Sequence, residues 1–305
     1  MGNTWTTEDL INDIKLLGHV PTGNKTFSEE KILRIATMEL QTSVMKQILS
    51  TRGGYYLDYE DITPNESGLY PIPKAAIAGA LVNIEIVSGQ SIVQVNQLSE
   101  SDQMSTDAPS STSYGFFMKG NFIQILPLPT MGILRIWFTK RTSDLILTSQ
   151  ASQINSINGS TLTVSSLPTS VLVGSSVDLC GDQPPFNVLG TKTITDITGT
   201  DVTLSSPVTD LNVGDWLALS GQTPIPQIPV EYRIILAQRV VVKIYELQGY
   251  LDKMKVASMK LQEYEKDVMN LITPRVKSNT KTIHAVQGGF LSSNASRISK
   301  FPAGA

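Results

Sequence analysis

The sequence contains an internal repeat with a spacing of 40 residues. Residues 154–181 read INSINGSTLTVSSLPTSVLVGSSVDLCG, and residues 194–221 read ITDITGTDVTLSSPVTDLNVGDWLALSG. The two copies align without a gap and share eleven identical residues. Each copy contains a Val-Gly pair, whose glycine is Gly174 in the first copy and Gly214 in the second. The pattern of each copy predicts a strand, a glycine turn, a second strand, a loop, a turn at the Val-Gly pair and a final strand, in that order. Because neither copy can bury an apolar face by itself, we expect the two to pack together as a duplicated small β-barrel or sandwich.

Two helices are expected after the repeat. Pro229 suits the first turn of a helix, and Gly249 ends that helix. In the residues that follow, apolar side chains recur at spacings of three and four until Pro274, with Lys and Glu outside them. This spacing predicts a second helix whose apolar seam packs against the first. The two helices should therefore form an antiparallel hairpin.

Two more helices and a β-rich middle are predicted before the repeat. Thr6 can cap a first helix with Asp9 three residues later, and a second helix runs from Ser28 to the glycines that follow Arg52. Aromatic, alternating and hairpin patterns then predict strands. These strands cover residues 55–59, 81–87, 114–118, 122–126 and 133–139.

Together these patterns predict an α+β fold with three parts. The body comprises residues 1–146 and 223–275, with the helix pairs and the β-rich middle, and residues 147–222 form the inserted, duplicated β-domain. Residues 276–305 form a basic tail with four Lys or Arg and no acid, so the rest of a chain of net charge −3 carries −7. Such a tail becomes ordered only through extensive contacts, for which a partner is the natural source; a frayed terminus is the alternative.

The composition excludes several classes of protein. The chain has 305 residues, 41 % of them hydrophobic, and its 24 Lys and Arg are outnumbered by 27 Asp and Glu. It is too apolar for a wholly disordered chain and too acidic for a bulk nucleic-acid binder. No apolar run is long enough to span a membrane, so no membrane contact is expected. The single cysteine, Cys180, allows no disulfide within the chain.

The sequence lacks the motifs of known enzyme chemistry. Neither His19 nor His284 lies in a pattern typical of a catalytic triad or a metal site. The segment Asp58–Asp61 is the densest group of carboxylates, but the pattern of a calcium-binding loop is absent. We therefore expect no enzyme activity, no cofactor and no metal. A hydrolase of the cell wall is the enzyme alternative. Its candidate carboxylates are Asp58, Glu60 and Asp178.

The order of several further motifs resembles head–tail connector proteins of tailed bacteriophages, especially those with short tails. The motifs are the two N-terminal helices and the aromatic strand after them, a Tyr-Pro-Ile-Pro segment, a long hairpin with the next strand, and the C-terminal helix pair. The resemblance covers residues 6–146 and 224–275. The residues that carry it are Ile48–Arg52, Tyr55–Leu57, Tyr70–Gly79, Gly115–Pro129, Leu134–Phe138, Ile228–Tyr232 and Pro274–Arg275.

This resemblance implies a structural protein of the virion neck. Connectors of this kind form a ring, typically a dodecamer, beneath the portal, and they join the capsid to the tail. The resemblance implies that the chain is made in the cytoplasm of a bacterial host and meets the portal protein above and a tail or nozzle protein below. DNA would pass through the lumen of the ring without specific binding, which suits a negatively charged body. The inserted β-domain departs from the smaller connectors, and it could meet the tail or the tail fibres.

Two sets of residues are candidates for these contacts. The basic tail could dock on the portal, with aromatic and Arg side chains as anchors. The C-terminal helix pair is the candidate for the ring core, and a head-to-tail ring requires two different matching faces on each subunit. The portal-docking candidates are Arg275, Lys277, Phe290, Arg297 and Phe301, and the ring-interface candidates are Tyr232, Val241, Tyr245 and Tyr264.

A binding module is the alternative function from a different class. In this reading, residues 147–222 recognise a glycan or another virion protein at the tail or its fibres. An exposed aromatic side chain on this domain would favour it. Phe186 and Trp216 are the only aromatic residues in that range, and Trp216 is expected to be part of the core.

Overall fold

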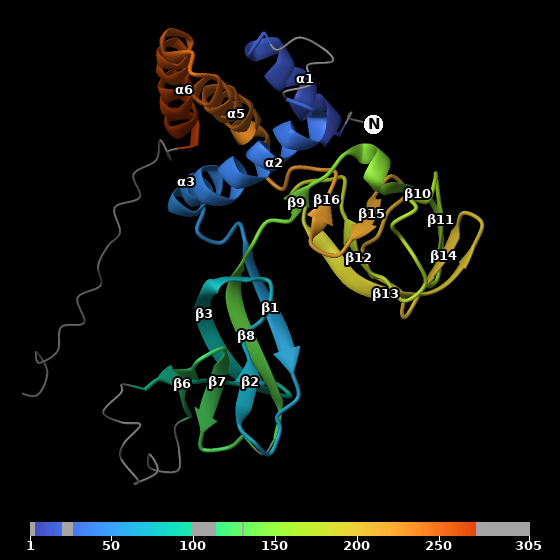
Figure 1. The fold of residues 1–305 in the computed structure, drawn as a ribbon. Coiled ribbons are helices and arrows are strands. Elements are labelled where there is room, and N and C mark those ends of the chain that lie inside the picture. Colours follow the sequence, from blue (N-terminus) through green and yellow to red (C-terminus); the bar gives the residue numbers. More distant parts are fainter. Residues whose placement is uncertain (1–3, 20–26, 99–113, 130, 273–305) are drawn as a thin grey trace, which may run out of the picture.

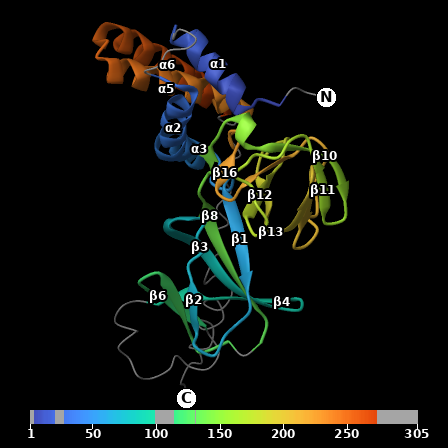
Figure 2. The same cartoon turned by 45° about the vertical axis from the view of Figure 1, so that its right-hand side comes forward.

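The computed structural model describes residues 4–19, 27–98, 114–129 and 131–272, without the side chains of residues 78 and 79. It confirms the predicted α+β class. Helices from both ends of the chain form a helical lobe, residues 57–140 form a sheet lobe, and the repeat forms a closed barrel (Figure 1). The helical and sheet lobes lie at opposite ends of the molecule, with the barrel beside their junction (Figures 1 and 2).

The helical lobe contains the four predicted helices, one of them interrupted. The first begins where predicted, because the backbone N–H of Thr6 donates to the Asp9 carboxylate at 2.8 Å. The middle of the second is a π-helix, which interrupts the expected continuous helix. The elements are α1 (Thr7–Leu17), α2 (Glu29–Glu39), the π-helix η1 (Leu40–Val44), α3 (Met45–Thr51), the 3₁₀ turn η3 (Val230–Tyr232), α5 (Arg233–Gln248) and α6 (Leu251–Ile272).

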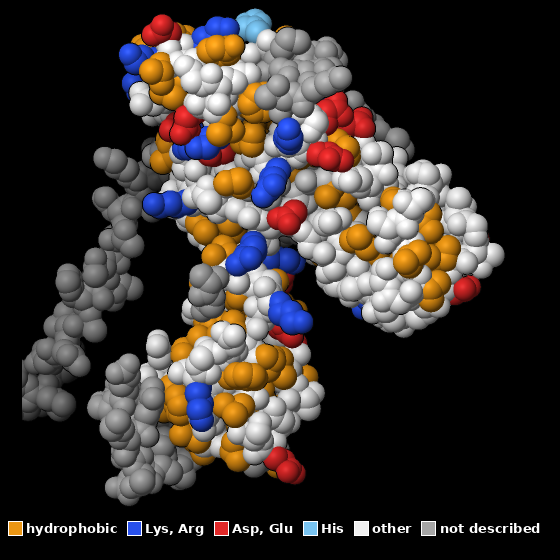
Figure 3. All heavy atoms as spheres, viewed as in Figure 1, with side chains coloured by type: hydrophobic (Ala, Val, Ile, Leu, Met, Phe, Trp, Pro, Cys, Tyr) orange, Lys and Arg blue, Asp and Glu red, His pale blue; other side chains and the backbone are white. Residues whose placement is uncertain are grey.

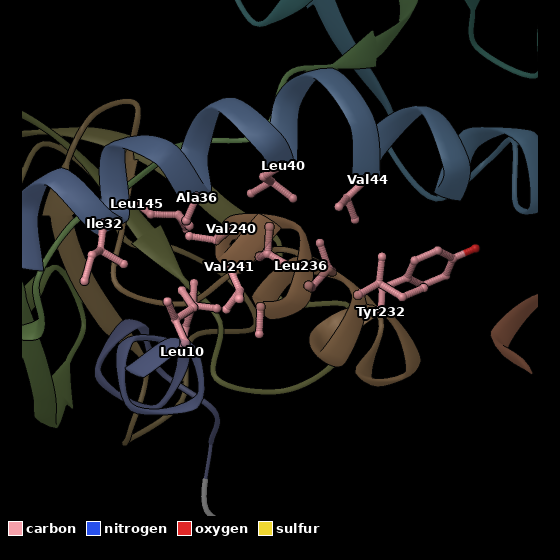
Figure 4. Packing of buried hydrophobic residues seen from close by; sticks show 14 of the residues in the cluster. Leu10, Ile32, Ala36, Leu40, Val44, Leu145, Tyr232, Leu236, Val240 and Val241 are labelled. Carbon is pink, nitrogen blue, oxygen red and sulfur yellow. The ribbon is translucent and has the colours of Figure 1, made fainter. Parts of the chain in front are cut away.

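The helix α5 is the centre of the helical lobe. Its side chains Leu236, Val240 and Val241 are buried, and they belong to one core with residues of α1, α2 and η1 (Figure 4). Gly249 ends α5 with a φ of 73°, a left-handed conformation that glycine adopts without strain. The chain then reverses into α6, which packs along α5 and completes the predicted hairpin.

The sheet lobe consists of two sheets around a core of its own. One sheet has the strand order β1-β8-β3-β4 and the other has the order β2-β7-β6-β5. Tyr70, Ile84 and Ile123 are fully buried in a cluster that both sheets supply. The predicted body of residues 1–146 and 223–275 therefore holds two separate cores. The strands are β1 (Leu57–Ile62), β2 (Leu69–Pro71), β3 (Ala76–Ser88), β4 (Ser91–Gln94), β5 (Asn96–Gln97), β6 (Gly115–Lys119), β7 (Phe122–Leu126) and β8 (Ile133–Lys140).

The first strand starts two residues later than predicted. Tyr55 and Tyr56 precede β1, and their hydroxyls donate to the carbonyl oxygens of Pro185 at 3.0 Å and Gln227 at 2.8 Å. Burial raises the pKa of Tyr55 to about 12, so its hydroxyl keeps the proton that it donates. The two rings thus join distant parts of the chain instead of lying in a sheet.

The barrel interleaves the two repeats. Its strands follow the order β10-β11-β14-β13-β12-β15 and close on β10, and exchanging the repeats leaves every pair of neighbours unchanged. Each Val-Gly turn forms a backbone hydrogen bond with the first strand of the other copy. The N–H of Gly174 donates to the Ile194 oxygen at 2.8 Å, and that of Gly214 donates to the Ile154 oxygen at 2.9 Å. The strands are β10 (Ser152–Asn158), β11 (Thr161–Val164), β12 (Ser176–Cys180), β13 (Val188–Thr198), β14 (Asp201–Leu204) and β15 (Trp216–Leu219).

Short elements join the barrel to the helical lobe. Two strands, β9 (Asp144–Leu145) and β16 (Gln222–Thr223), pair in parallel where the chain enters and leaves the barrel. A 3₁₀ turn, η2 (Thr148–Gln150), follows β9. Of the two predicted arrangements of the repeat, the structure therefore contains the small barrel.

Candidate assembly surface on the helical lobe

Three of the four predicted ring-interface residues lie inside the protein's own core. Tyr232 and Val241 are 1 % exposed, and Tyr245 is 8 % exposed. The Tyr232 hydroxyl lies 2.9 Å from that of Thr51, and the Tyr245 hydroxyl donates to the Gly18 oxygen at 3.0 Å. The surrounding helices leave almost none of these three side chains exposed, although Tyr232 and Tyr245 line the grooves on the two sides of α6.

The helix α6 is attached to the lobe through one narrow seam. Of its 22 residues, only Ala257 and Val268 are buried. Tyr264, the fourth predicted interface residue, is half-buried in this seam together with Met254 and Leu261. The rest of the circumference is exposed, so within the predicted helix pair α6 has more open surface than α5.

A charged cluster holds the C-terminal half of α6 in place. Arg239 of α5 forms an ion pair with Glu265 of α6 and another, at 3.9 Å, with Glu39 of α2. The side-chain amide of Gln47 donates to the same Glu265 carboxylate at 2.9 Å. Charged groups that are this enclosed need partners, and Glu265 finds its partners within the chain.

A groove runs along each side of α6. One groove, with a volume of about 400 Å³, lies between α3 and α6. The other, of about 370 Å³, lies between the C-terminal end of α1 and α6. The first is lined by residues that include Gln47, Ser50, Gln262, Lys266 and Met269, and the second by residues that include Leu17, His19, Lys253, Val256 and Lys260.

The outward side of α6 is apolar as well as charged. Val256, Met259 and Leu271 are 57 %, 71 % and 68 % exposed. Hydrophobic side chains lie among Lys, Arg and acidic side chains over the helical lobe in the space-filling view (Figure 3). Within the described part of the chain, seven charged side chains of α6 have no side-chain hydrogen bond or ion pair. They are Asp252, Lys253, Lys255, Lys260, Glu263, Lys266 and Asp267.

The charges of α6 are mixed along its length. Asp252 lies in the first turn, where an acid stabilises a helix. The rest of the N-terminal half carries Lys253, Lys255 and Lys260, and the C-terminal half carries Glu263, Glu265 and Asp267 together with Lys266. Of these three acids, Glu265 has an ion-pair partner within the described residues.

A large cleft lies where the three lobes meet. Its volume is about 850 Å³. Bases and acids both line it, so it has no preference for a ligand of one charge. The charged lining residues are Glu60, Lys74, Lys140, Arg141, Asp144 and Asp178.

Two of the three carboxylates of β1, Asp58 and Asp61, are engaged in ion pairs, and the third, Glu60, lines the cleft. Asp58 accepts a hydrogen bond from Lys140 at 2.8 Å, and Asp61 accepts two bonds of 2.8 Å from Arg135. The Arg135 guanidinium also lies over the Tyr59 ring, 4.3 Å from its centre. The hydrogen bond from Arg135 lowers the pKa of Asp61, so this carboxylate stays ionised. Both acids therefore have a structural role, because each one joins β1 to β8 through an ion pair.

The polar and aromatic candidates of the barrel are also held by internal contacts. Asp178 is buried, and it accepts hydrogen bonds from the Thr191 hydroxyl at 2.7 Å and the Gly221 N–H at 2.8 Å. Phe186 is 4 % exposed, and Trp216 is half-buried against a small apolar cluster. Residues 147–222 are all described, and neither of their aromatic rings presents an open platform for a sugar.

The predicted portal-docking residues lie in the segment 273–305, outside the described residues. His284 lies there as well, whereas His19 borders the groove between α1 and α6. The docking candidates that lie in this segment are Arg275, Lys277, Phe290, Arg297 and Phe301.

No protein-family model matches the chain, and no curated protein matches it. None of the described helices is long and apolar enough to cross a membrane. Among the described residues, no group of three or more His, Cys, Asp or Glu side chains is placed to hold a metal ion. The surfaces of the described residues are therefore the features of this chain that bear on its function.

Sequence reasoning missed the two sides of α6. The apolar seam of this helix is correctly predicted, with Lys and Glu outside it. The two sides of the helix differ because α3 borders a groove on one side and α1 borders a groove on the other. No local pattern places those two helices there.

Proposed function

We propose that this protein is a structural, non-enzymatic subunit of the head–tail connector of a tailed bacteriophage. In this role it forms a ring of identical subunits beneath the portal, typically a dodecamer, and joins the capsid to the tail. The observation that carries the proposal is that α6 has different grooves on its two sides. A closed head-to-tail ring requires two different surfaces on each subunit.

The arrangement of the lobes supports an adaptor role. The helical lobe and the sheet lobe lie at opposite ends of the molecule (Figure 2). A subunit at the head–tail junction must contact one partner towards the capsid, the portal, and another towards the tail, such as a nozzle protein. Two ends with separate cores can serve these two contacts without disturbing each other.

The charge distribution supports the same role. The net charge of −7 outside the tail gives the body a weakly repulsive potential towards DNA, which suits a lumen that the genome must pass through. The basic tail is proposed to dock on the portal. The residues proposed for this contact are Arg275, Lys277, Phe290, Arg297 and Phe301.

The barrel is proposed to serve a lateral partner, such as the tail fibres. It projects to the side of the axis that joins the other two lobes (Figure 1). Because its aromatic residues are packed inside, the proposed contact is with protein and not with sugar. This assignment places the protein in the neck of the virion.

The first experiment is a measurement of absolute mass by light scattering, on the protein alone and after mixing with its purified portal ring. We expect a closed species of about twelve chains of 33.2 kDa, alone or on the portal. A variant that lacks residues 276–305 should keep its circular dichroism and lose the portal. A full-length chain that stays monomeric and ignores the portal would contradict the proposal.

A further inference from the structure

Two stripes of exposed side chains run along α6, one on each side of its buried seam. Residues three and four apart lie on the same side of a helix with 3.6 residues per turn. We name the stripes after the helix beside each groove. The α3-side stripe consists of Lys255, Met259, Gln262, Lys266 and Met269, and the last three line the groove beside α3. The α1-side stripe consists of Val256, Lys260, Glu263, Asp267 and Leu271, and the first two line the groove beside α1.

The two stripes have opposite charge in the C-terminal half of the helix. There the α3-side stripe carries Lys266 and no acid, and the α1-side stripe carries Glu263 and Asp267 and no base. Within the described residues, none of these three side chains has an ion pair. Their charges are therefore available to a second chain.

Rotational symmetry determines how two copies of α6 would meet. Neighbours in a ring are related by rotation about the ring axis, so neighbouring α6 helices point the same way at the same height when α6 lies along that axis. The proposed contact takes α6 in this orientation. One copy then presents its α3-side stripe to the α1-side stripe of the next. At each level the chemistry matches. The facing pairs are Gln262 with Glu263, Lys266 with Asp267, and Met269 with Leu271.

We propose that this contact between the C-terminal halves of neighbouring α6 helices links the subunits of the ring. A second copy of this chain occupies the groove between α3 and α6, and its α1-side stripe fills that groove. The inference rests on the proposed ring function and names the contact within it.

The N-terminal halves of the helices do not take part. In the same register, Lys255 would face Val256 and Met259 would face Lys260, so the lysines there would meet apolar side chains and no opposite charge. The contact is limited to about 16 Å of helix, about 10 Å wide, which is small beside the roughly 800 Å² per partner of a stable complex. Free subunits should therefore stay monomeric, and the ring should form on the portal, which holds the subunits side by side.

A charge swap tests the contact. Asp267→Lys or Lys266→Asp alone places like charges across every interface, and we expect ring formation on the portal to weaken at least about tenfold. The double variant K266D/D267K restores opposite charges and should restore the ring. Glu66→Lys, an exposed acid of the sheet lobe, is the matched control and should assemble like the wild type. Mass photometry of portal mixtures measures the rings, and circular dichroism verifies folding.

The outcomes separate this inference from the proposed function. If the wild type assembles on the portal and the single variants assemble equally well, the α6 contact is wrong and the connector role stands. A double variant that stays as defective as the single variants also overturns the contact. A wild-type chain that never assembles with the portal overturns the connector role and the contact together.

Cysteine cross-linking gives a second measurement on assembled rings. Cys180 is buried, so introduced cysteines supply the reactive thiols. With a short bifunctional reagent, the double variant Q262C/E263C should give a ladder of dimers, trimers and larger species. Each single variant should give no ladder, because the contact joins two different residues. A ladder from a single variant, or no ladder from the double variant, would overturn the head-to-tail contact.

Discussion

The barrel and α6 differ in how their apolar surfaces are covered. In the barrel, every strand has two neighbours, and core residues such as Ile154 and Leu179 are fully buried. Along α6, two residues of 22 are buried, and Met259 and Leu271 are largely exposed. A sheet that closes on itself leaves no edge for another chain, whereas a helix held by one seam leaves apolar and charged surface available. The comparison shows that the two repeats satisfy each other's strand edges and apolar faces within the barrel. We therefore look for partner-binding surface on the helical lobe.

Thiol reactivity should show the largest difference between the two regions. Burial raises the pKa of Cys180 in the barrel to about 12, so little thiolate forms near neutral pH. A cysteine introduced by Met259→Cys lies at a position that is 71 % exposed. We expect Cys180 to react about a thousandfold or more slowly than the new cysteine, because its reaction requires the barrel to open. Stopped-flow absorbance with an aromatic disulfide reagent measures both rates, and similar rates would show that the barrel is not closed.

Truncation of one leucine in each region should sharpen the comparison. Leu179→Ala removes a fully buried side chain from the barrel, and we expect it to lower the free energy of unfolding by about 2–5 kcal/mol. Leu271→Ala removes a side chain that is 68 % exposed, and its effect should stay within about 0.5 kcal/mol. Urea denaturation followed by circular dichroism measures both values. Equal losses would contradict the distinction, and Leu271→Ala should instead weaken ring formation on the portal.

A smaller loss of stability than that of Leu179→Ala is expected where α6 is attached. Arg239→Ala leaves Glu39 and Glu265 without their shared cation, which should cost about 1–3 kcal/mol. The loss should be local, so hydrogen exchange of the α6 amides should speed up while the barrel amides keep their protection. Arg239→Lys retains the charge and serves as the control. Unchanged exchange in α6 would mean that the apolar seam alone holds the helix.

Much of the secondary structure could be predicted from local patterns. The capping pair Thr6 and Asp9 marks the start of α1, and Gly249 marks the end of α5, because these residues act on their own turn of the helix. The repeat predicted a closed β-domain, because each copy carries complete strand and turn signals but too little apolar surface to fold by itself. These signals depend on residues close together in the chain.

The candidate surface could not be predicted in the same way. Tyr232, Val241 and Tyr245 were expected at a ring interface because large aromatic and apolar residues are typical of interfaces and of cores alike. Only the arrangement of the helices shows that they are enclosed. The Tyr232 hydroxyl meets that of Thr51 across 181 positions of sequence, and no periodicity within one helix indicates such a partner.

The sequence by itself therefore determined the α+β class, the ends of several helices and the presence of a duplicated β-domain, since propensity, capping and repetition are local properties. The tertiary structure decided that the repeats interleave, that the middle of the chain has its own core, and that α5 is enclosed while α6 is exposed. The physical reason is that burial is set by contacts between distant segments. The same apolar stripe is core or interface according to which segment the fold brings against it.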